Sequence, residues 1–226
     1  VLGHDAFAGQ DFAALWRALG GTGPLRAARG RAPDDARELA SWQSQPLAVA
    51  LSDINKYSNN TMARTLFLTL GREAGGGDTA AAAERALREE LIHRGMDDVG
   101  ALVLENGSGL SRRERVTARM LGEVLLDAAR GPYAGEFIAS LPIAATDGTL
   151  KKRFAELGPR LRMKTGTLND VKALAGYWQA ADGRRLAIVA IVNSPRAMES
   201  GKALDAVVAD LARGFNTETM RSSARR

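Results

Sequence analysis

The chain has 226 residues, of which 45% are hydrophobic and 25% charged, a composition typical of folded globular proteins. The absence of cysteine excludes a disulfide framework or a thiolate metal site, and two histidines are too few for a histidine-rich one, so we expect no metal and no cofactor. The longest apolar run, residues 186–192, is far shorter than the roughly 20 residues of a membrane span. The net charge of +5 is spread along the chain and indicates solvated surface rather than a nucleic-acid site.

The first half of the chain predicts helices separated by polar breaks. Residues 11–21 have apolar side chains at three-to-four spacing and end in glycine, which predicts an amphipathic helix. Residues 32–72 are expected to be helical in pieces, with breaks before Pro46 and near Ser58. A glycine-rich connection then leads to an alanine-rich helix over residues 79–95.

The second half predicts strands as well as helices. A short apolar strand at 101–104 leads into the loop 105–111, and Thr117 is placed to cap the helix that follows. Asp182 and Gly183 form a strong hairpin signal. The segments expected as three later strands are 161–165, 171–180 and 184–192. A final amphipathic helix is expected to cover the sheet with a side made of Ala203, Val207, Val208 and Leu211. The fold class is therefore mixed α/β in one domain, with helices on the faces of an antiparallel sheet.

Polar residues end the first of these strands. Lys164, Thr165, Gly166 and Thr167 stand together where the strand opens into a turn. A glycine there lets a second extended chain approach the strand edge, and lysine and hydroxyl groups beside it suit a carboxylate. Taken alone, the tripeptide K-T-G is common, and a glycine that serves only the turn is the simpler interpretation.

A second polar stretch, YSNN, favours a ligand-binding role of K-T-G over a role in the turn alone. It interrupts an apparent helix, so Ser58 and Asn60 are expected to be exposed at a helix junction. The alternative is that Ser58 or Asn59 simply caps a helix. An S-x-N followed by K-T-G about a hundred residues later matches two of the three motifs of β-lactamases and penicillin-binding proteins.

Longer segments carry the same resemblance in the same order. They are INKYSNNTMARTLFLTLG, ENGSGLSRRERVTARMLGEVL, SLPIAATDGTLKKRF and MKTGTLNDVKALAGYW. The chain resembles the C-terminal part of class C low-molecular-mass penicillin-binding proteins, which are bacterial D-alanyl-D-alanine carboxypeptidases that also act as endopeptidases. The resemblance covers nearly the whole chain and implies part of a penicillin-binding-protein/β-lactamase-like transpeptidase domain.

The resemblance implies acyl transfer at the D-Ala-D-Ala end of periplasmic peptidoglycan stem peptides, with β-lactam antibiotics as inhibitors. Ser58 would then belong to the proton-transfer network around the leaving amine, and Asn60 would bind the substrate backbone. Lys164 would make the cleft positive. The hydroxyls of Thr165 and Thr167 would hold the terminal carboxylate, and the N–H of Thr167 would supply half of the oxyanion hole.

Two other serine or aspartate positions look catalytic at first sight. Ser108 lies between two glycines and Asp147 precedes Gly148, but both patterns are typical of turns. We therefore expect Ser108 and Asp147 to shape the neighbourhood of the cleft rather than to react.

The third motif of the family, S-x-x-K, carries its nucleophilic serine, and no lysine in this sequence has a serine three residues before it. We therefore expect residues 1–226 to be the C-terminal portion of the catalytic domain, to lack the N-terminal segment with the nucleophile, and to be inactive alone.

Two alternatives stay open. A non-catalytic module that binds peptidoglycan or protein would lack that serine by nature, and a β-lactamase relative would need a deacylating glutamate loop, of which we find no convincing equivalent. An S-x-x-K upstream in the reading frame would favour the enzyme.

Overall fold

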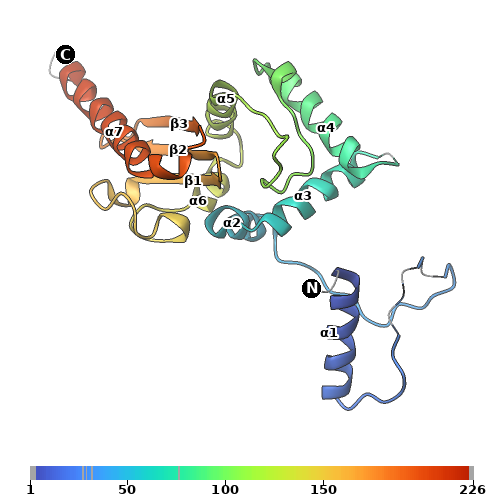
Figure 1. Cartoon of the computed structure of the whole chain (residues 1–226). Coiled ribbons are helices and arrows are strands. Elements are labelled where there is room, and N and C mark those ends of the chain that lie inside the picture. Colours follow the sequence, from blue (N-terminus) through green and yellow to red (C-terminus); the bar gives the residue numbers. More distant parts are fainter. Residues whose placement is uncertain (1–3, 27, 29, 32, 76, 224–226) are drawn as a thin grey trace. The chain divides into compact units, whose positions relative to one another are not determined.

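The computed structural model describes residues 4–26, 28, 30–31, 33–75 and 77–223 (Figure 1). The chain divides into two units, Val1–Ser44 and Gln45–Arg226. The first unit contains helix α1 (His4–Ala18), which begins earlier than the predicted helix and ends near its predicted end. Within the described residues, no helix is both long enough and apolar enough to cross a membrane.

The segment before Pro46 lacks the helix predicted from the sequence. The described residues from 33 to 46 form no helix, although pieces of helix were expected there. Leu39 and Trp42 are 85% and 91% exposed. A short helix is marginal in water unless its apolar side is buried, and these side chains are not buried.

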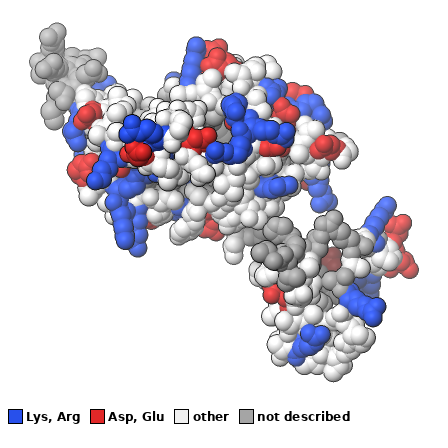
Figure 2. All heavy atoms as spheres, viewed as in Figure 1, with Lys and Arg blue, Asp and Glu red and all other residues white. Residues whose placement is uncertain are grey.

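Among the described residues, the second unit contains the remaining helices and three strands. The helices are α2 (Leu47–Tyr57), α3 (Asn60–Glu73), α4 (Thr79–His93), α5 (Ala118–Ala128), α6 (Ala134–Ser140) and α7 (Gly201–Ser223), with short 3-10 turns η1 (Val99–Ala101), η2 (Gly148–Leu150), η3 (Gly158–Arg160) and η4 (Ala197–Ser200). The predicted cap of α5 is confirmed, because the side chain of Thr117 accepts a hydrogen bond from the N–H of Met120 at 3.1 Å. Figure 2 shows Lys and Arg interspersed with Asp and Glu on the drawn face of this unit.

The predicted strand at 101–104 is wrong. Val103 forms a single bridge with Arg115, and no longer ladder follows. The apolar residues of this segment instead pack as a turn, because Val99 and Leu102 are buried against Met120 of α5. Burial against a helix therefore replaces pairing with a strand.

The predicted antiparallel meander is confirmed. Its strands are β1 (Leu161–Leu168), β2 (Val171–Gln179) and β3 (Arg185–Asn193), in the order β1-β2-β3. Both pairs are antiparallel. The β2–β3 connection uses the predicted hairpin, with Gly183 at φ +88°, a conformation that glycine adopts without strain. Strand β1 is consequently at an edge of this sheet, and K-T-G lies on that edge strand.

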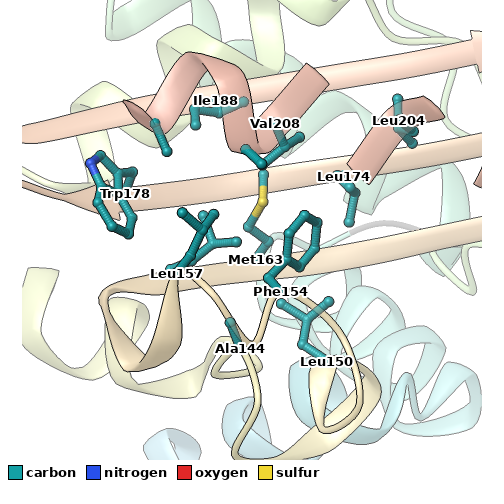
Figure 3. Close-up of a cluster of buried hydrophobic side chains, with 13 residues drawn as sticks. Ala144, Leu150, Phe154, Leu157, Met163, Leu174, Trp178, Ile188, Leu204 and Val208 are labelled. Carbon is teal, nitrogen blue, oxygen red and sulfur yellow. The ribbon is translucent and has the colours of Figure 1, made fainter. Parts of the chain in front are cut away.

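Both faces of the sheet are covered. Helix α7 packs on one face, and Figure 3 shows Leu204 and Val208 above Leu174 and Met163. On the other face, β2 and β3 pack against residues of α5 and α6. The sheet is therefore a central layer covered on both faces, and β1 is one of its edge strands.

The side of α7 that faces the sheet differs from the prediction. The buried residues are Leu204, Val208, Ala209 and Ala212, whereas Ala203 is exposed and Val207 and Leu211 are 51% and 48% exposed. Of the expected residues, only Val208 is buried. Two apolar stripes, each with a spacing of four, run along this helix one residue apart, and the sheet buries the stripe of residues 204, 208 and 212 rather than that of residues 203, 207 and 211.

Candidate active site

Ser58 lies at a sharp junction between two helices. Helix α2 ends at Tyr57, and Ser58 adopts the left-handed conformation, with φ 53° and ψ 48°. Asn59 then caps α3 by accepting a hydrogen bond from the N–H of Met62 at 3.1 Å. The predicted break is confirmed, and of the two capping alternatives Asn59 is the N-cap. A non-glycine residue held in this region costs about 1–3 kcal/mol, which the surrounding structure must offset.

The side chain of Ser58 meets Lys164 of strand β1. The Nζ atom of Lys164 donates to Oγ of Ser58 at 2.5 Å and to the carbonyl oxygen of Thr165 at 2.9 Å. Burial lowers the pKa of Lys164 from its ordinary value of 10.5. The lysine is thus held in one place by an acceptor on each side.

The free edge of β1 is open beside this contact. At the start of the strand, Leu161 O accepts from Ala144 N, and Met163 N donates to Pro142 O, both at 3.0 Å on the edge opposite β2. Because backbone groups alternate along a strand, Thr167 also turns its N–H towards that edge. Beyond Met163, no strand among the described residues pairs with this second edge of β1, the edge opposite β2. An extended peptide could therefore add to β1 there.

The loop 105–111 forms another wall of the site. Asn60 donates through Nδ2 to the carbonyl oxygen of Ser108 at 2.5 Å. The carboxylate of Glu114 accepts from three successive backbone N–H groups of the loop, at 3.2 to 3.3 Å. Gly107 has a φ of +66°, and a Cβ there would lie 2.4 Å from that of Phe67. The loop is thus fixed to α3, and Ser108 shapes the wall as expected.

These walls enclose a pocket of about 480 Å³. Its lining includes all six predicted site residues, which are Ser58, Asn60, Lys164, Thr165, Gly166 and Thr167. The prediction that the two motifs line one cleft is confirmed. Sequence reasoning missed Thr149, which also lines the pocket. The segment TDGTL contained a signal, since Thr149 follows the turn residues Asp147 and Gly148 in it.

The fold and the pocket together define a class of protein. A mixed α/β unit with K-T-G on an edge strand beside an S-x-N junction is the arrangement expected of penicillin-binding proteins. Residues 1–213 match the model of the D-Ala-D-Ala carboxypeptidase 3 (S13) family. The chain belongs to this family, and the resemblance read from the sequence is confirmed.

Individual relatives are similar over much of this chain. It is 37% identical over 156 residues to a D-alanyl-D-alanine carboxypeptidase of Actinomadura sp., covering 66% of this chain and 29% of that protein. It is 32% identical over 206 residues to a carboxypeptidase of Mycobacterium tuberculosis, covering 87% and 44%. The structure of penicillin binding protein 4 from Haemophilus influenzae, complexed with a β-lactam, matches with a TM-score of 0.72 and 27% identity, covering 86% and 45%. The chain spans less than half the length of each.

Proposed function

We propose that this chain carries the substrate-binding part of a serine-type D-Ala-D-Ala carboxypeptidase and endopeptidase acting on peptidoglycan stem peptides in the periplasm. The observation that carries the proposal is the 2.5 Å contact between Lys164 Nζ and Ser58 Oγ at the open edge of β1. Membership of the S13 family supports the reaction class. β-Lactams are the proposed inhibitors, supported by the β-lactam complex of the Haemophilus relative.

The substrate is proposed to lie along β1 as an added strand, with Gly166 allowing its close approach. The ammonium group of Lys164 and the hydroxyls of Thr165 and Thr167 face its terminal carboxylate. These groups are hydrogen-bond donors, and hydrogen bonds to a charged acceptor are stronger than those between neutral groups. The site would therefore select peptides that end in a free carboxylate.

Ser58 is proposed to pass a proton to the leaving amine. Its Oγ accepts from Lys164, so its own O–H is left to donate into the pocket. Asn60 uses one N–H on Ser108 and keeps a second N–H and its carbonyl oxygen for the substrate backbone. The N–H of Thr167 is a proposed oxyanion donor, and such donors contribute about 2.7–4 kcal/mol to transition-state stabilisation.

The nucleophile is proposed to come from chain outside these 226 residues, with residues 1–226 forming a portion of the catalytic domain. Two observations support this: the sequence has no S-x-x-K, and the matched relatives are more than twice as long as the matched part. A serine oxygen would attack the carbonyl carbon of the penultimate D-Ala, and the C–N bond would break. The terminal D-Ala would leave with a proton from Ser58, and water would hydrolyse the ester.

The test uses protein expressed from the whole open reading frame. Incubation with benzylpenicillin should give one covalent adduct by intact-mass spectrometry, and an acylated D-Ala-D-Ala peptide should release D-alanine. A cross-linked dimeric stem peptide tests the endopeptidase. Peptide binding with neither adduct nor turnover would favour the non-catalytic binding module. If the peptide neither binds nor reacts, the proposed function is wrong.

A further inference from the structure

Another pocket, of about 440 Å³, lies beside helix α6, and none of its lining residues belongs to the candidate active-site pocket. Three arginines line it: Arg160 ends the turn η3, Arg162 is in strand β1, and Arg185 begins strand β3. The wall contributed by α6 is apolar, with Ile138 as its largest side chain. A concave pocket with apolar walls and a few polar groups of one kind is the usual form of a small-ligand site.

The register of the sheet brings two of these arginines together. Arg162 lies opposite Tyr177, and Gln179, two residues further along β2, lies opposite Arg185. Because side chains alternate across a strand, Tyr177 and Gln179 project to the same face of the sheet, and their cross-strand partners project with them. This is the face on which α5 and α6 pack. Arg162 and Arg185 therefore approach one pocket from the two outer strands.

No carboxylate neutralises the arginines of this pocket among the described residues. None of the three forms an ion pair there, and no acidic side chain lines the pocket. Arg184 differs from its neighbour Arg185, because it pairs with Asp182 at 2.8 Å. Glu136 of α6 is exposed and does not belong to the lining. Like charges around a concave pocket focus a positive potential in it, which an anion would neutralise.

Aromatic rings restrain two of the guanidinium groups. That of Arg185 lies 5.8 Å from the ring centre of Tyr177, and its Nε donates to Oε1 of Gln179 at 3.3 Å. The guanidinium of Arg160 lies 4.7 Å from the ring centre of Trp178. A stacked guanidinium keeps N–H groups at its edge for a ligand, and a restrained side chain loses less freedom when it binds one. The pocket is thus partly arranged for an anion.

The number of charges favours a phosphate group over a single carboxylate. A phosphate monoester carries about two negative charges at pH 7 and three terminal oxygens, whereas a carboxylate carries one charge and two oxygens. Two guanidinium forks match the charge and the oxygens of the phosphate. The apolar wall of α6 would lie against the carbon atoms of the ester.

We propose that this pocket binds a phosphate monoester, with the phosphate held by Arg162 and Arg185. Arg160 adds positive charge at the pocket but has its guanidinium over Trp178, so its contribution is smaller. The inference goes beyond the proposed function and does not depend on it, because no step of the proposed reaction uses this pocket.

The experiment measures binding to protein expressed from the whole reading frame, by calorimetry at low ionic strength. The probes are glycerol 3-phosphate, neutral glycerol and succinate, which has two negative charges but no phosphate. We expect glycerol 3-phosphate to bind, glycerol not to bind, and succinate to bind about tenfold more weakly or less tightly still, because its two charges are apart. Co-sedimentation with phosphatidylcholine vesicles, with and without phosphatidic acid, shows whether a lipid headgroup can also supply the phosphate.

Arginine variants test which side chains hold the phosphate. Arg162→Gln and Arg185→Gln should each lower the affinity for glycerol 3-phosphate about tenfold or more, because a hydrogen bond between two charged groups is lost. Arg160→Gln should lower it about threefold or less, since only a more distant charge is removed. Arg184→Gln is the matched control and should leave the affinity unchanged. Arg185 is exposed, so its substitution tests the site even if Arg162→Gln perturbs the sheet.

Binding of glycerol 3-phosphate with this order of losses sustains the inference, whether or not the vesicles bind; vesicle binding would only add a lipid as a second source of the phosphate. Absence of binding by both glycerol 3-phosphate and the phosphatidic acid vesicles would overturn it. Succinate binding as tightly as the phosphate would also overturn it, because the pocket would then select charge alone. An equal loss in Arg184→Gln and Arg185→Gln would mean that general surface charge attracts the anion, and would overturn it too.

Discussion

The Nζ atom of Lys164 lies 2.5 Å from Oγ of Ser58, a residue 106 positions earlier in the chain. This contact joins the edge strand of the sheet to the α2–α3 junction. It converts two short polar motifs into one site, and it requires the charged Lys164 side chain to be partly buried, which costs folding stability.

The charge on Lys164 is expected to reduce stability at neutral pH. Burial lowers its pKa in the folded state below the unfolded value of 10.5, so between these two values the unfolded chain binds more protons, and stability rises with pH. Lys164→Met should therefore raise the free energy of unfolding at pH 7, with an advantage that narrows as the pH rises towards 10.5. Urea denaturation from pH 7 to pH 11 measures this.

The same substitution should lower penicillin acylation of the protein from the whole reading frame by about a hundredfold or more, since a charged hydrogen-bond donor is lost from the pocket. Lys151→Met, at an exposed position, is the matched control. A gain in the free energy of unfolding of Lys164→Met that widens as the pH rises would contradict the prediction that the buried charge of Lys164 costs stability.

Tyr177 is expected to make the fold sensitive to alkali. Its hydroxyl donates to the carbonyl oxygen of Leu125 at 2.5 Å, and burial raises its pKa from 10.0 to about 12. Between these values the folded state binds more protons, so this contribution to stability is lost as the pH rises. Tyr177→Phe should cost about 1 kcal/mol at pH 7 and remove this dependence. Phenolate absorbance should show an ionisation near pH 12 that Tyr177→Phe removes, and a titration curve that the substitution leaves unchanged at that pH would refute the prediction.

Any side chain at position 148 is expected to destabilise the fold. An alanine there must adopt a φ of +54° with its Cβ 2.6 Å from a backbone oxygen, which should destabilise the unit by about 2 kcal/mol or more. Gly122, inside α5, has nothing within 4 Å of the equivalent position, so Gly122→Ala should stabilise by about 0.5–1 kcal/mol. Thermal denaturation of both variants checks the sign, and a neutral Gly148→Ala would mean that the η2 turn is not fastened to α2.

The two adjacent valines of α7 should differ in their contributions. Val208 is fully buried against the sheet, whereas Val207 is 51% exposed. Val208→Ala should cost about 2 kcal/mol and Val207→Ala about 0.5 kcal/mol or less. Chemical denaturation of each variant measures the difference. A larger cost for Val207→Ala than for Val208→Ala would mean that α7 buries the face expected from the sequence.

The 226 residues expressed alone should form no penicillin adduct. Ser58 has Lys164 beside it, but no S-x-x-K serine is present to act as the activated nucleophile. Intact-mass spectrometry after incubation with benzylpenicillin checks this, with the protein from the whole reading frame as the positive control. A stoichiometric adduct on these 226 residues would mean that the nucleophile is misplaced, and peptide mapping would find it.

Local chemistry made several features predictable from the sequence. Polar residues that compete with the helix backbone indicated the break at Ser58, and Thr117 indicated a cap. Asp182 and Gly183 indicated the hairpin, and with it the antiparallel order of β2 and β3. The motifs indicated which residues would share a cleft. Each of these signals depends on one residue and its near neighbours.

Other features depended on which surfaces were buried. Leu39 and Trp42 follow a helical pattern in a segment that forms no helix, and Val99 and Leu102 pack on a helix instead of joining a strand. Because hydrophobic stabilisation comes from apolar area removed from water, a periodic pattern shows only that a side can be buried and not what will cover it.

Thr149 shows, within the site, the same difference between what local sequence determines and what packing of the whole unit determines. The sequence by itself determined that Lys164 and Ser58 carry polar groups suited to one kind of ligand. Only the tertiary structure decided that Thr149 joins them, because its position follows from the ion pair of Asp147 with Lys56 and from the close packing of Gly148. Contacts between residues some ninety positions apart arise from the packing of the whole unit, and no local pattern encodes them.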